Sequence, residues 1–184
     1  IADLVALART AGRHRQRAEQ LAHQAYLDPL TGLMNWQHLQ QRLQEEVDRE
    51  EARARPRRAL LYIDLDQFRY INDTLGHETG DHLLSEVAKE LIAIQPSESL
   101  LGRVGGDEFL MAVPRLDAGE AHSLGESTRQ RLTNFAFRVG DRTITLSVSI
   151  GIAPLEDGFA TAGDLLARAD LACNQAKEEG RNRV

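Results

Sequence analysis

Residues 100–113 read LLGRVGGDEFLMAV, two apolar runs on either side of a glycine pair and two adjacent carboxylates. Two β-type runs separated by Gly105 and Gly106 are typical of a hairpin whose turn needs positive φ. Because glycine has no Cβ, such a turn also lets a phosphate or a ribose approach the backbone closely. With Asp107 and Glu108 beside it, the stretch predicts a metal-dependent nucleotide site. The alternative is an ordinary exposed hairpin whose acids are solvated.

A second pair of acids, Asp64 and Asp66, follows the apolar run ALLYI at residues 59–63. Carboxylates at the end of a buried strand cost free energy unless they are paired or bound to a cation. If this strand lies beside the hairpin, Asp64 and Asp107 converge as oxygen ligands. Mg²⁺ prefers one or two such carboxylates together with waters and substrate phosphates. The alternative, an acid that caps the next helix, fits Asp66 better than Asp64.

The composition indicates a soluble globular protein. The chain has 184 residues, 42% hydrophobic and 27% charged, which predicts one well-buried domain of roughly 150 residues plus an extension. A formal net charge of -6 argues against a surface that coats nucleic acid, so we expect no nucleic-acid partner. No apolar run approaches the ~20 residues of a membrane span, so we expect a cytoplasmic domain. Cys173 is the only cysteine, which excludes an internal disulfide and favours a small buried side chain.

The N-terminal segment 1–27 has small and apolar residues at alternating steps of three and four. This pattern predicts a helical, coiled-coil-like extension that links an upstream domain to the rest of the chain. The alternative is a single amphipathic helix packed on its own domain. Because the chain starts at Ile1 rather than at methionine, we expect a piece of a longer protein with room for upstream sensory domains, downstream domains and a membrane anchor.

Helical and strand patterns alternate after residue 28. The expected elements are helices near 35–53, 80–94, 117–135 and 162–179, a strand at 59–65, and hairpins across 105–106 and 140–141. Strands mixed with helices in this order predict an α+β fold, a mainly antiparallel central sheet covered by helices on one face.

Further motifs along residues 28–184, together with the glycine-acid stretch, resemble the GGDEF domains of bacterial diguanylate cyclases, which condense two GTP molecules into cyclic di-GMP. The motifs are Asp28-Pro29-Leu30-Thr31-Gly32-Leu33 with Asn35, Asp64-Leu65-Asp66 with Phe68, Ile71-Asn72-Asp73, Gly76-His77, Gly80-Asp81, Arg103, Ser147-Val148-Ser149-Ile150-Gly151, Ala176-Lys177 and Gly180-Arg181-Asn182. The resemblance implies a nucleotidyltransferase of second-messenger signalling with a ferredoxin-like palm similar to nucleotide cyclases. Residues 28–184 would be the GGDEF domain and 1–27 a signalling helix.

The resemblance also implies a metal centre. Asp64 and Asp107 are the expected side-chain ligands and Leu65 the backbone ligand of Mg²⁺ (or Mn²⁺). Metal ions lower the pKa of an attacking ribose 3′-hydroxyl and neutralise the departing oxygens. Asp107 is expected to help activate this hydroxyl, with Glu108 and Arg69 as the other catalytic residues. Whether Glu108 contacts metal, water or a structural arginine stays open.

The same resemblance implies that Asn72 and Asp81 recognise the guanine base, with His77 nearby. A carboxylate can accept hydrogen bonds from the N1–H and the exocyclic amine of guanine, which adenine cannot supply. Taken without the resemblance, Asn72 is typical of an Asx turn and Asp81 of a helix N-cap.

Phosphate binding is expected from Phe68 and Arg69 at a helix start, where free backbone N–H groups favour anions. Arg69 replaces the usual lysine of the family, and its planar fork would hold a phosphate oxygen in a different geometry. Lys177 and Arg181 are four residues apart, so we expect both near one face at the end of the last helix. Their alternative role is to complement the helix dipole.

One chain offers one GTP site while the reaction consumes two molecules, so the resemblance implies a catalytic homodimer. Pro96 and Ser99 stand where many family members carry the Arg and Asp of a product-inhibition site, which predicts that this Arg-x-x-Asp site is absent. The alternative function is a catalytically silent GTP-binding module that regulates an attached EAL phosphodiesterase domain. A third alternative, a purely structural dimerisation adaptor, would not need the residues expected to recognise guanine.

Overall fold

The computed structural model describes residues 26–51, 58–155 and 161–184. Nearly all of the expected coiled-coil extension lies outside the described residues, so it stays a prediction. The helices are α2 (Trp36–Glu51), α3 (Phe68–Leu75), α4 (His77–Ile94), α5 (Ala118–Asn134) and α6 (Ala162–Glu178). The strands are β1 (Arg58–Leu65), β2 (Leu100–Arg103), β3 (Glu108–Pro114), β4 (Phe137–Val139), β5 (Arg142–Ile144) and β6 (Val148–Leu155). Within these ranges, no helix combines the length and the apolar character that crossing a bilayer requires.

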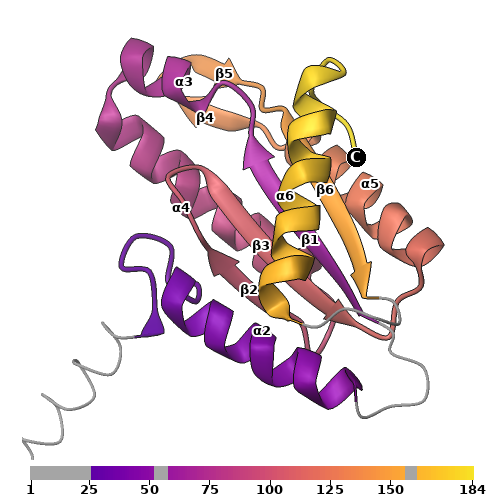
Figure 1. Cartoon of the computed structure of the whole chain (residues 1–184). Helices are drawn as coiled ribbons and strands as arrows, with labels where there is room; N and C mark the ends of the chain where they lie inside the picture. Colours follow the sequence, from indigo (N-terminus) through magenta and orange to yellow (C-terminus); the bar gives the residue numbers. More distant parts are fainter. Residues whose placement is uncertain (1–25, 52–57, 156–160) are drawn as a thin grey trace, which may run out of the picture.

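The central sheet has the strand order β2-β3-β1-β6, and every pairing in it is antiparallel (Figure 1). β4 and β5 form a separate hairpin around Gly140, whose φ of 58° lies in the left-handed region. Helices cover both faces of the central sheet. This architecture confirms the predicted α+β fold with a mainly antiparallel sheet. The expectation that helices cover only one face was wrong, because α4 and α5 pack on one face of β1 and β6 while α2 and α6 pack on the other.

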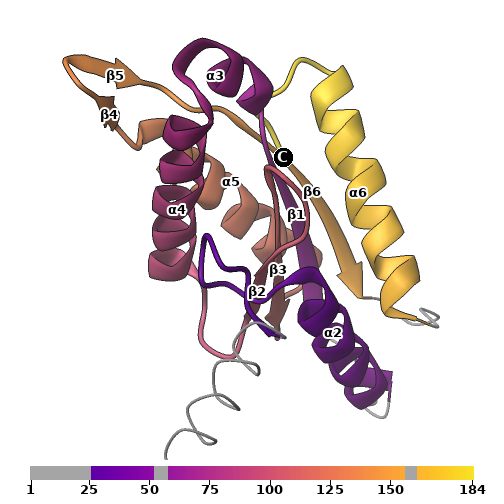
Figure 2. The same ribbon diagram turned by 90° about the vertical axis from the view of Figure 1, so that its left-hand side faces the viewer.

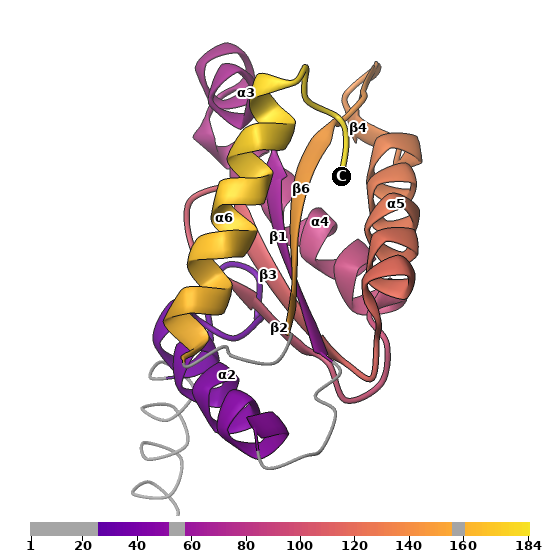
Figure 3. The same ribbon diagram turned by 45° about the vertical axis from the view of Figure 1, so that its right-hand side comes forward.

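The central strand β1 is buried along its whole length because helices pack on both of its faces. Its odd-numbered residues 59–65 belong to a core shared with α4 and α5, whereas Leu60 and Tyr62 belong to a second core shared with α2 and α6. Figure 2 shows α4 on one side of the sheet and α6 with α2 on the other, and Figure 3 shows α5 and α6 on opposite sides of β6. Burial on both faces explains why residues 59–63 are an unbroken apolar run instead of an alternating one.

The helix α6 comes very close to β6 at a glycine. A Cβ built on Gly151 would stand 2.0 Å from the Ala169 carbonyl oxygen and 2.2 Å from the Cys173 amide nitrogen. Both are backbone atoms, so the whole helix would have to move to admit a side chain there. Gly151 lies opposite Tyr62 in the pairing of β1 with β6, which places Tyr62 beneath this part of α6. Cys173 is buried at this contact, which confirms the prediction of a small buried side chain.

The turn at Gly105 and Gly106 differs from the expectation of positive φ. Among the described residues, the glycines with positive φ are Gly32, Gly76, Gly140 and Gly180. The prediction for the glycine pair was therefore wrong. Residues 104–107 connect β2 to β3, and a connection of this length does not need the left-handed residues that a two-residue hairpin turn requires. The Val104 N–H closes it by donating to the Glu108 carbonyl at 2.9 Å.

The close approach of α6 predicts that Gly151→Ala is strongly destabilising. We expect the free energy of unfolding, measured by urea denaturation, to fall by about 2–3 kcal/mol because the added methyl group overpacks a backbone contact. Gly163→Ala, on the exposed first turn of the same helix, is the matched control and should change it by less than about 1 kcal/mol. Equal stability of the two variants would show that α6 can shift away from β6 at no cost.

Candidate active site

The strand β1 carries Asp64 into the interior of the protein, where it is only 6% exposed. In the sheet register, Asp64 lies opposite Glu108 of β3 and Ser149 of β6. The next residue, Leu65, donates its N–H to the Asp107 carbonyl at 3.2 Å, which holds the loop between β2 and β3 against the end of β1. The register and this hydrogen bond therefore bring Asp64, Asp107 and Glu108 together at one end of the sheet.

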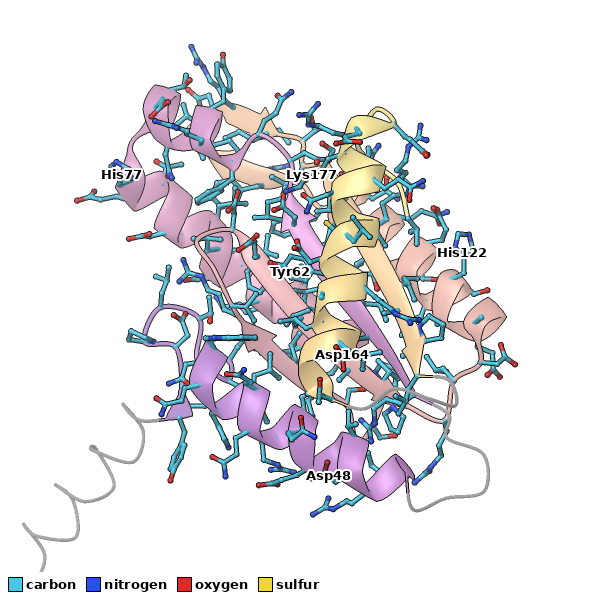
Figure 4. All side chains as sticks on the ribbon, viewed as in Figure 1. Asp48, Tyr62, His77, His122, Asp164 and Lys177 are labelled. Atoms are coloured by element: carbon cyan, nitrogen blue, oxygen red, sulfur yellow. The ribbon has the colours of Figure 1, made fainter. Side chains whose placement is uncertain are left out.

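Negative charge exceeds positive charge at this acidic end of the sheet. Lys177 of α6 donates a hydrogen bond from Nζ to Asp64 Oδ2 at 2.6 Å, and Figure 4 shows it beside the end of β1. Burial raises the pKa of Asp64 to about 6; Lys177 opposes the rise, while the charges of Asp107 and Glu108 add to it. Burial and the charge of Glu108 also raise the pKa of Asp107. Burial disfavours the charge on Lys177, but Asp64 outweighs this effect and raises the lysine pKa.

This donor set fits a divalent cation, because added positive charge would favour the ionised forms of Asp64 and Asp107. Across the described residues, no three His, Cys, Asp or Glu side chains are grouped closely enough to form a complete metal cage. Mg²⁺ does not need one, since it is usually held by one or two carboxylates together with waters and substrate phosphates. Asp64, Asp107 and the Leu65 carbonyl are the groups of this chain that could hold it.

An ion pair between Arg103 and Asp28 holds the glycine loop from its other side. Arg103 donates to the Gly106 carbonyl at 2.7 Å and to the two Asp28 carboxylate oxygens at 3.2 and 3.3 Å. The Asp28 carboxylate also accepts from the Thr31 N–H at 2.9 Å and the Thr31 hydroxyl at 2.7 Å. Burial works against ionised Asp28, but the bonds from Thr31 and Arg103 outweigh it and hold its pKa below the ordinary value. The loop that carries Asp107 is thus fixed at both ends.

The carboxylate of Asp66 ties the C-terminal tail to the sheet. It accepts a hydrogen bond from the Ser149 hydroxyl at 2.8 Å and another from the Asn182 N–H at 3.1 Å. The N-cap of α3 is Gln67, which makes no side-chain capping bond. The interpretation of Asp66 as a helix cap was therefore wrong, because the buried carboxylate finds its donors in distant parts of the chain.

The last helix ends before Arg181. α6 stops at Glu178, and the chain reverses through Gly180 with φ of 118° and Arg181 with φ of 62°. The Arg181 N–H donates to the Ala176 carbonyl at 3.0 Å, a closure typical of helices that end in left-handed residues. The expectation that Lys177 and Arg181 share a helical face was wrong for this reason. Lys177 does lie in the last turn, where its charge complements the helix dipole.

The residues expected to read guanine lie on the two adjoining helices α3 and α4. Asn72 is inside α3 and Asp81 is inside α4, so neither the Asx-turn nor the N-cap alternative holds. A Cβ built on Gly80 would stand 1.9 Å from Asn72 Oδ1, so this glycine lets the amide pack against α4 beside Asp81. Asn72 Oδ1 is buried and has no hydrogen-bond partner in the described part of the chain. His77 is exposed at the start of α4, at the outer edge of the molecule (Figure 4).

The residues expected to bind phosphate lie at the start of α3. The Phe68 ring is buried in the core, so its contribution to phosphate binding would come from the backbone N–H. The Arg69 side chain is 94% exposed, and it forms a loose ion pair with Asp73 at 3.9 Å. The structure thus directs Arg69 toward solvent and does not pair it with the acids at the end of β1.

The sequence interpretation missed one contributor to the site. It gave no role to the pairing of Asp28 with Arg103, which joins residues far apart in the sequence. No local pattern could have revealed that contact.

Removing the counter-charge of Asp64 should destabilise the protein in a pH-dependent way. For Lys177→Met we expect the free energy of unfolding to fall by about 2 kcal/mol at pH 8, the scale of a charged hydrogen bond. Because the pKa of Asp64 is about 6, the loss should shrink at pH 5, where this carboxyl is protonated. Mn²⁺ should stabilise the variant more than the parent protein. Lys89→Met, an exposed lysine of α4, is the control, and an equal loss at both pH values would contradict the pairing.

The ion pair between Asp28 and Arg103 predicts a second pH dependence of the free energy of unfolding. The pKa of Asp28 is lowered in the folded state, so the stability it contributes is present above the unfolded pKa of 3.8 and is lost as the pH falls through the folded value. We expect Asp28→Asn to lower the free energy of unfolding by about 1–2 kcal/mol at pH 7 and by less at pH 3. Asp141→Asn, in the exposed β4–β5 turn, should have little effect at either pH. A loss for Asp28→Asn that is independent of pH would rule out the charge as its cause.

Comparison with known proteins identifies relatives for this site and fold. Residues 25–183 match the family model described as "Diguanylate cyclase, GGDEF domain". The chain is 32% identical over 170 residues to the probable diguanylate cyclase DgcE of Escherichia coli, a match that covers 92% of this chain and 15% of DgcE. It is 34% identical over 163 residues to the bifunctional diguanylate cyclase/cyclic di-GMP phosphodiesterase MucR of Pseudomonas aeruginosa, covering 89% of this chain and 24% of MucR. The chain therefore spans only a small part of these relatives.

Among solved structures, the coiled coil and GGDEF domain of DgcB from Caulobacter crescentus, in complex with c-di-GMP, matches with a TM-score of 0.89 at 28% identity. The match covers 100% of this chain and 96% of that one. The antiparallel palm-like sheet flanked by helices is thus shared with a GGDEF structure. Since the family model also covers nearly all of the sequence, this chain belongs to the GGDEF family of diguanylate cyclase domains.

Proposed function

We propose that this domain is a diguanylate cyclase, which joins two GTP molecules into cyclic di-GMP and releases pyrophosphate. The observation that carries the proposal is the excess of negative charge at the end of β1, where the buried Asp64 and the partly buried Asp107 and Glu108 lie near Lys177, with Arg103 beside Asp107. Withdrawing these carboxylates from water costs free energy, and a domain that served only as a scaffold would gain nothing from that cost. Membership of the GGDEF family supports this choice of reaction.

Asp64, Asp107 and the Leu65 carbonyl would hold Mg²⁺ or Mn²⁺ at this end of the sheet. When bound, the cation lowers the pKa of the ribose 3′-hydroxyl and neutralises charge on the phosphate as pyrophosphate leaves. Asp107 would help to take the proton from the hydroxyl. Burial and the charge of Glu108 raise the pKa of Asp107 in the structure, and a cation bound there would favour the ionised carboxylate that this role requires.

Lys177 would change partners during this reaction. In the structure it neutralises Asp64, but a cation at Asp64 would replace it there and leave its ammonium group for the substrate phosphates. Arg181, just past the end of the same helix, would bind the phosphates as well. The first N–H groups of α3, at Phe68 and Arg69, are not capped by the Gln67 side chain and would donate hydrogen bonds to a phosphate as a third contact.

Asn72 and Asp81 would read the guanine base, with His77 beside them. The packing of Asn72 against Gly80 supports this, because it brings the amide next to Asp81 across the α3–α4 junction. A buried acceptor without a partner is uncommon in folded proteins, and Asn72 Oδ1 is one. The fold therefore leaves this amide available for a role outside its own packing.

A homodimer is part of the proposal, because one GTP site per chain cannot supply both halves of the product. Each subunit would present its bound GTP to the other across a two-fold axis. The segment 1–27 would set the geometry of the pair as a signalling helix. Sensory domains upstream and an EAL domain downstream belong to the same proposal for the longer protein, and the short share of DgcE and MucR that this chain covers supports it.

A second candidate function is a GTP-binding module without activity, which regulates an attached phosphodiesterase. The name of MucR, which joins a cyclase to a cyclic di-GMP phosphodiesterase, favours keeping this candidate. The two functions share the binding residues and differ only in whether bound GTP reacts.

Chromatography of the products formed from GTP and Mg²⁺ tests the proposed function. We expect cyclic di-GMP from GTP and no cyclic product from ATP, because adenine lacks the donors that Asp81 would bind. Asp107→Asn should lower the rate at least ~100-fold, on the scale of lost acid–base catalysis. Asp48→Asn, an exposed acid of α2, is the control. Binding of a non-hydrolysable GTP analogue without product would favour the silent module, and absence of both would contradict each function.

A further inference from the structure

The chain reverses direction after α6 through residues 180–182, all of which have positive φ. The φ angle is 118° at Gly180, 62° at Arg181 and 49° at Asn182. Glycine adopts such angles freely and asparagine more readily than most residues, whereas they cost arginine free energy. A backbone of this kind persists only where the surrounding structure holds it. The contacts of this turn therefore identify what keeps Arg181 in place.

The side chain of Asn182 contacts α5. Its Oδ1 accepts hydrogen bonds from Arg129 Nη1 at 3.1 Å and from the Thr133 hydroxyl at 3.1 Å. Arg129 is itself held by Glu126, which accepts from its Nε at 3.1 Å and from its Nη2 at 2.9 Å. The guanidinium thus presents Nη1 to Asn182, and a hydrogen bond from a charged donor is stronger than one between neutral groups. Figure 3 shows the tail crossing from the end of α6 toward α5.

The backbone of Asn182 contacts the end of β1. Its N–H donates to Asp66 Oδ2 at 3.1 Å. Asp66 is buried, and its other carboxylate oxygen accepts from the Ser149 hydroxyl at 2.8 Å, so this anchor is itself fixed to β6. Because Asp66 is two residues after Asp64, the bond ties the turn to the acidic end of the sheet.

Arg181 is held by the backbone on both sides of the turn. Its N–H donates to the Ala176 carbonyl at 3.0 Å, next to Lys177 in the last turn of α6. After the turn, the Arg183 carbonyl accepts from the Ile150 N–H at 2.9 Å. The Arg181 side chain is exposed, and it makes no hydrogen bond or ion pair with any residue that the structure describes. Its backbone is thus fixed while its guanidinium stays available.

We propose that Asn182 is a positioning residue, which joins α5 to Asp66 and so holds the turn that presents Arg181 to the substrate phosphates. The inference rests on the proposed function, which assigns Arg181 to those phosphates. The helix α6 ends at Glu178, so helical geometry does not align Arg181 with Lys177. The turn sets this alignment instead, and Asn182 ties the turn to two elements at once.

Asn182→Gly removes the amide, keeps the backbone N–H and tolerates the positive φ, so it is the direct test. We expect the dissociation constant for a non-hydrolysable GTP analogue with Mg²⁺, measured by calorimetry, to rise about ten-fold, because a small displacement of a binding group weakens its contact. The KM for GTP should rise by a similar factor with little change in kcat, the pattern of a lost ground-state contact. Affinity for guanosine, which has no phosphate, should not change. Asn134→Gly, at the exposed end of α5, is the control.

Thr133 offers a second route to the same amide. Thr133→Val removes the donor with little change in shape and should weaken binding of the GTP analogue about three-fold, the scale of one hydrogen bond. Thr133→Ser keeps the hydroxyl and should bind the analogue as the parent protein does. In an Arg181→Met background, neither Asn182→Gly nor Thr133→Val should weaken binding further. Circular dichroism checks that each variant is folded.

Unchanged affinity for the GTP analogue in Asn182→Gly would overturn the inference. An equal loss with and without Arg181, or an equal loss of affinity for guanosine, would also overturn it, because either shows a general loosening of the tail. If the parent protein binds the analogue but forms no cyclic di-GMP from GTP, the cyclase activity fails, while the affinity comparison still decides the role of Asn182. A parent protein that binds neither the analogue nor guanosine would overturn both.

Discussion

The carboxylate of Asp64 is buried at the end of the central strand β1, where acidic charges outnumber basic ones, and the contacts at this end of the sheet depend on that imbalance. Burial raises the pKa of Asp64 and of Asp107, and the neighbouring acidic charges add to the rise. A buried ionised group is tolerated only when partners compensate it. Lys177 compensates part of the charge, and in the proposed function a cation and the substrate phosphates would compensate the rest.

Several distant features of the fold serve this one arrangement. Lys177 can reach Asp64 only because α6 lies directly on β6, and that approach depends on the absence of a side chain at Gly151. The loop that carries Asp107 is held to β1 by the Leu65 N–H and to the turn at Asp28 by Arg103. Such support from rigid elements is what a preorganised centre requires. The strongly buried β1, packed on both faces, supplies the stability that offsets the cost of its acidic end.

The elements with regular periodicity could be predicted from the sequence. The helical stripe in residues 80–94 identified α4, and the apolar run before Asp64 identified β1, because burial on both faces leaves an unbroken apolar pattern. Helix ends were less predictable. α4 begins at His77 and α6 stops at Glu178, so Asp81 became an interior residue and Arg181 a residue of the following turn. These shifts of a few residues changed the role assigned to each side chain.

The contacts that no prediction foresaw join residues far apart in the chain. Asp66 binds Ser149 and the tail at Asn182, and no local pattern distinguishes such a carboxylate from a helix cap. The glycine pair was assigned to a turn by composition, but its conformation depended on where β2 and β3 end, which strand pairing decides. A side chain at Gly105 would meet the Glu108 carboxylate, a contact that only the folded structure reveals.

The central claim is that the acidic end of β1 is a metal and nucleotide centre in which a cation takes the place of Lys177 at Asp64. A crystal structure with Mn²⁺ and a non-hydrolysable GTP analogue, with data collected at the manganese absorption edge, tests this most directly. The account predicts an anomalous peak in contact with Asp64 and Asp107, and the Lys177 ammonium moved from Asp64 to a phosphate oxygen. A peak elsewhere, or a peak at this end with Lys177 still bound to Asp64, would contradict it.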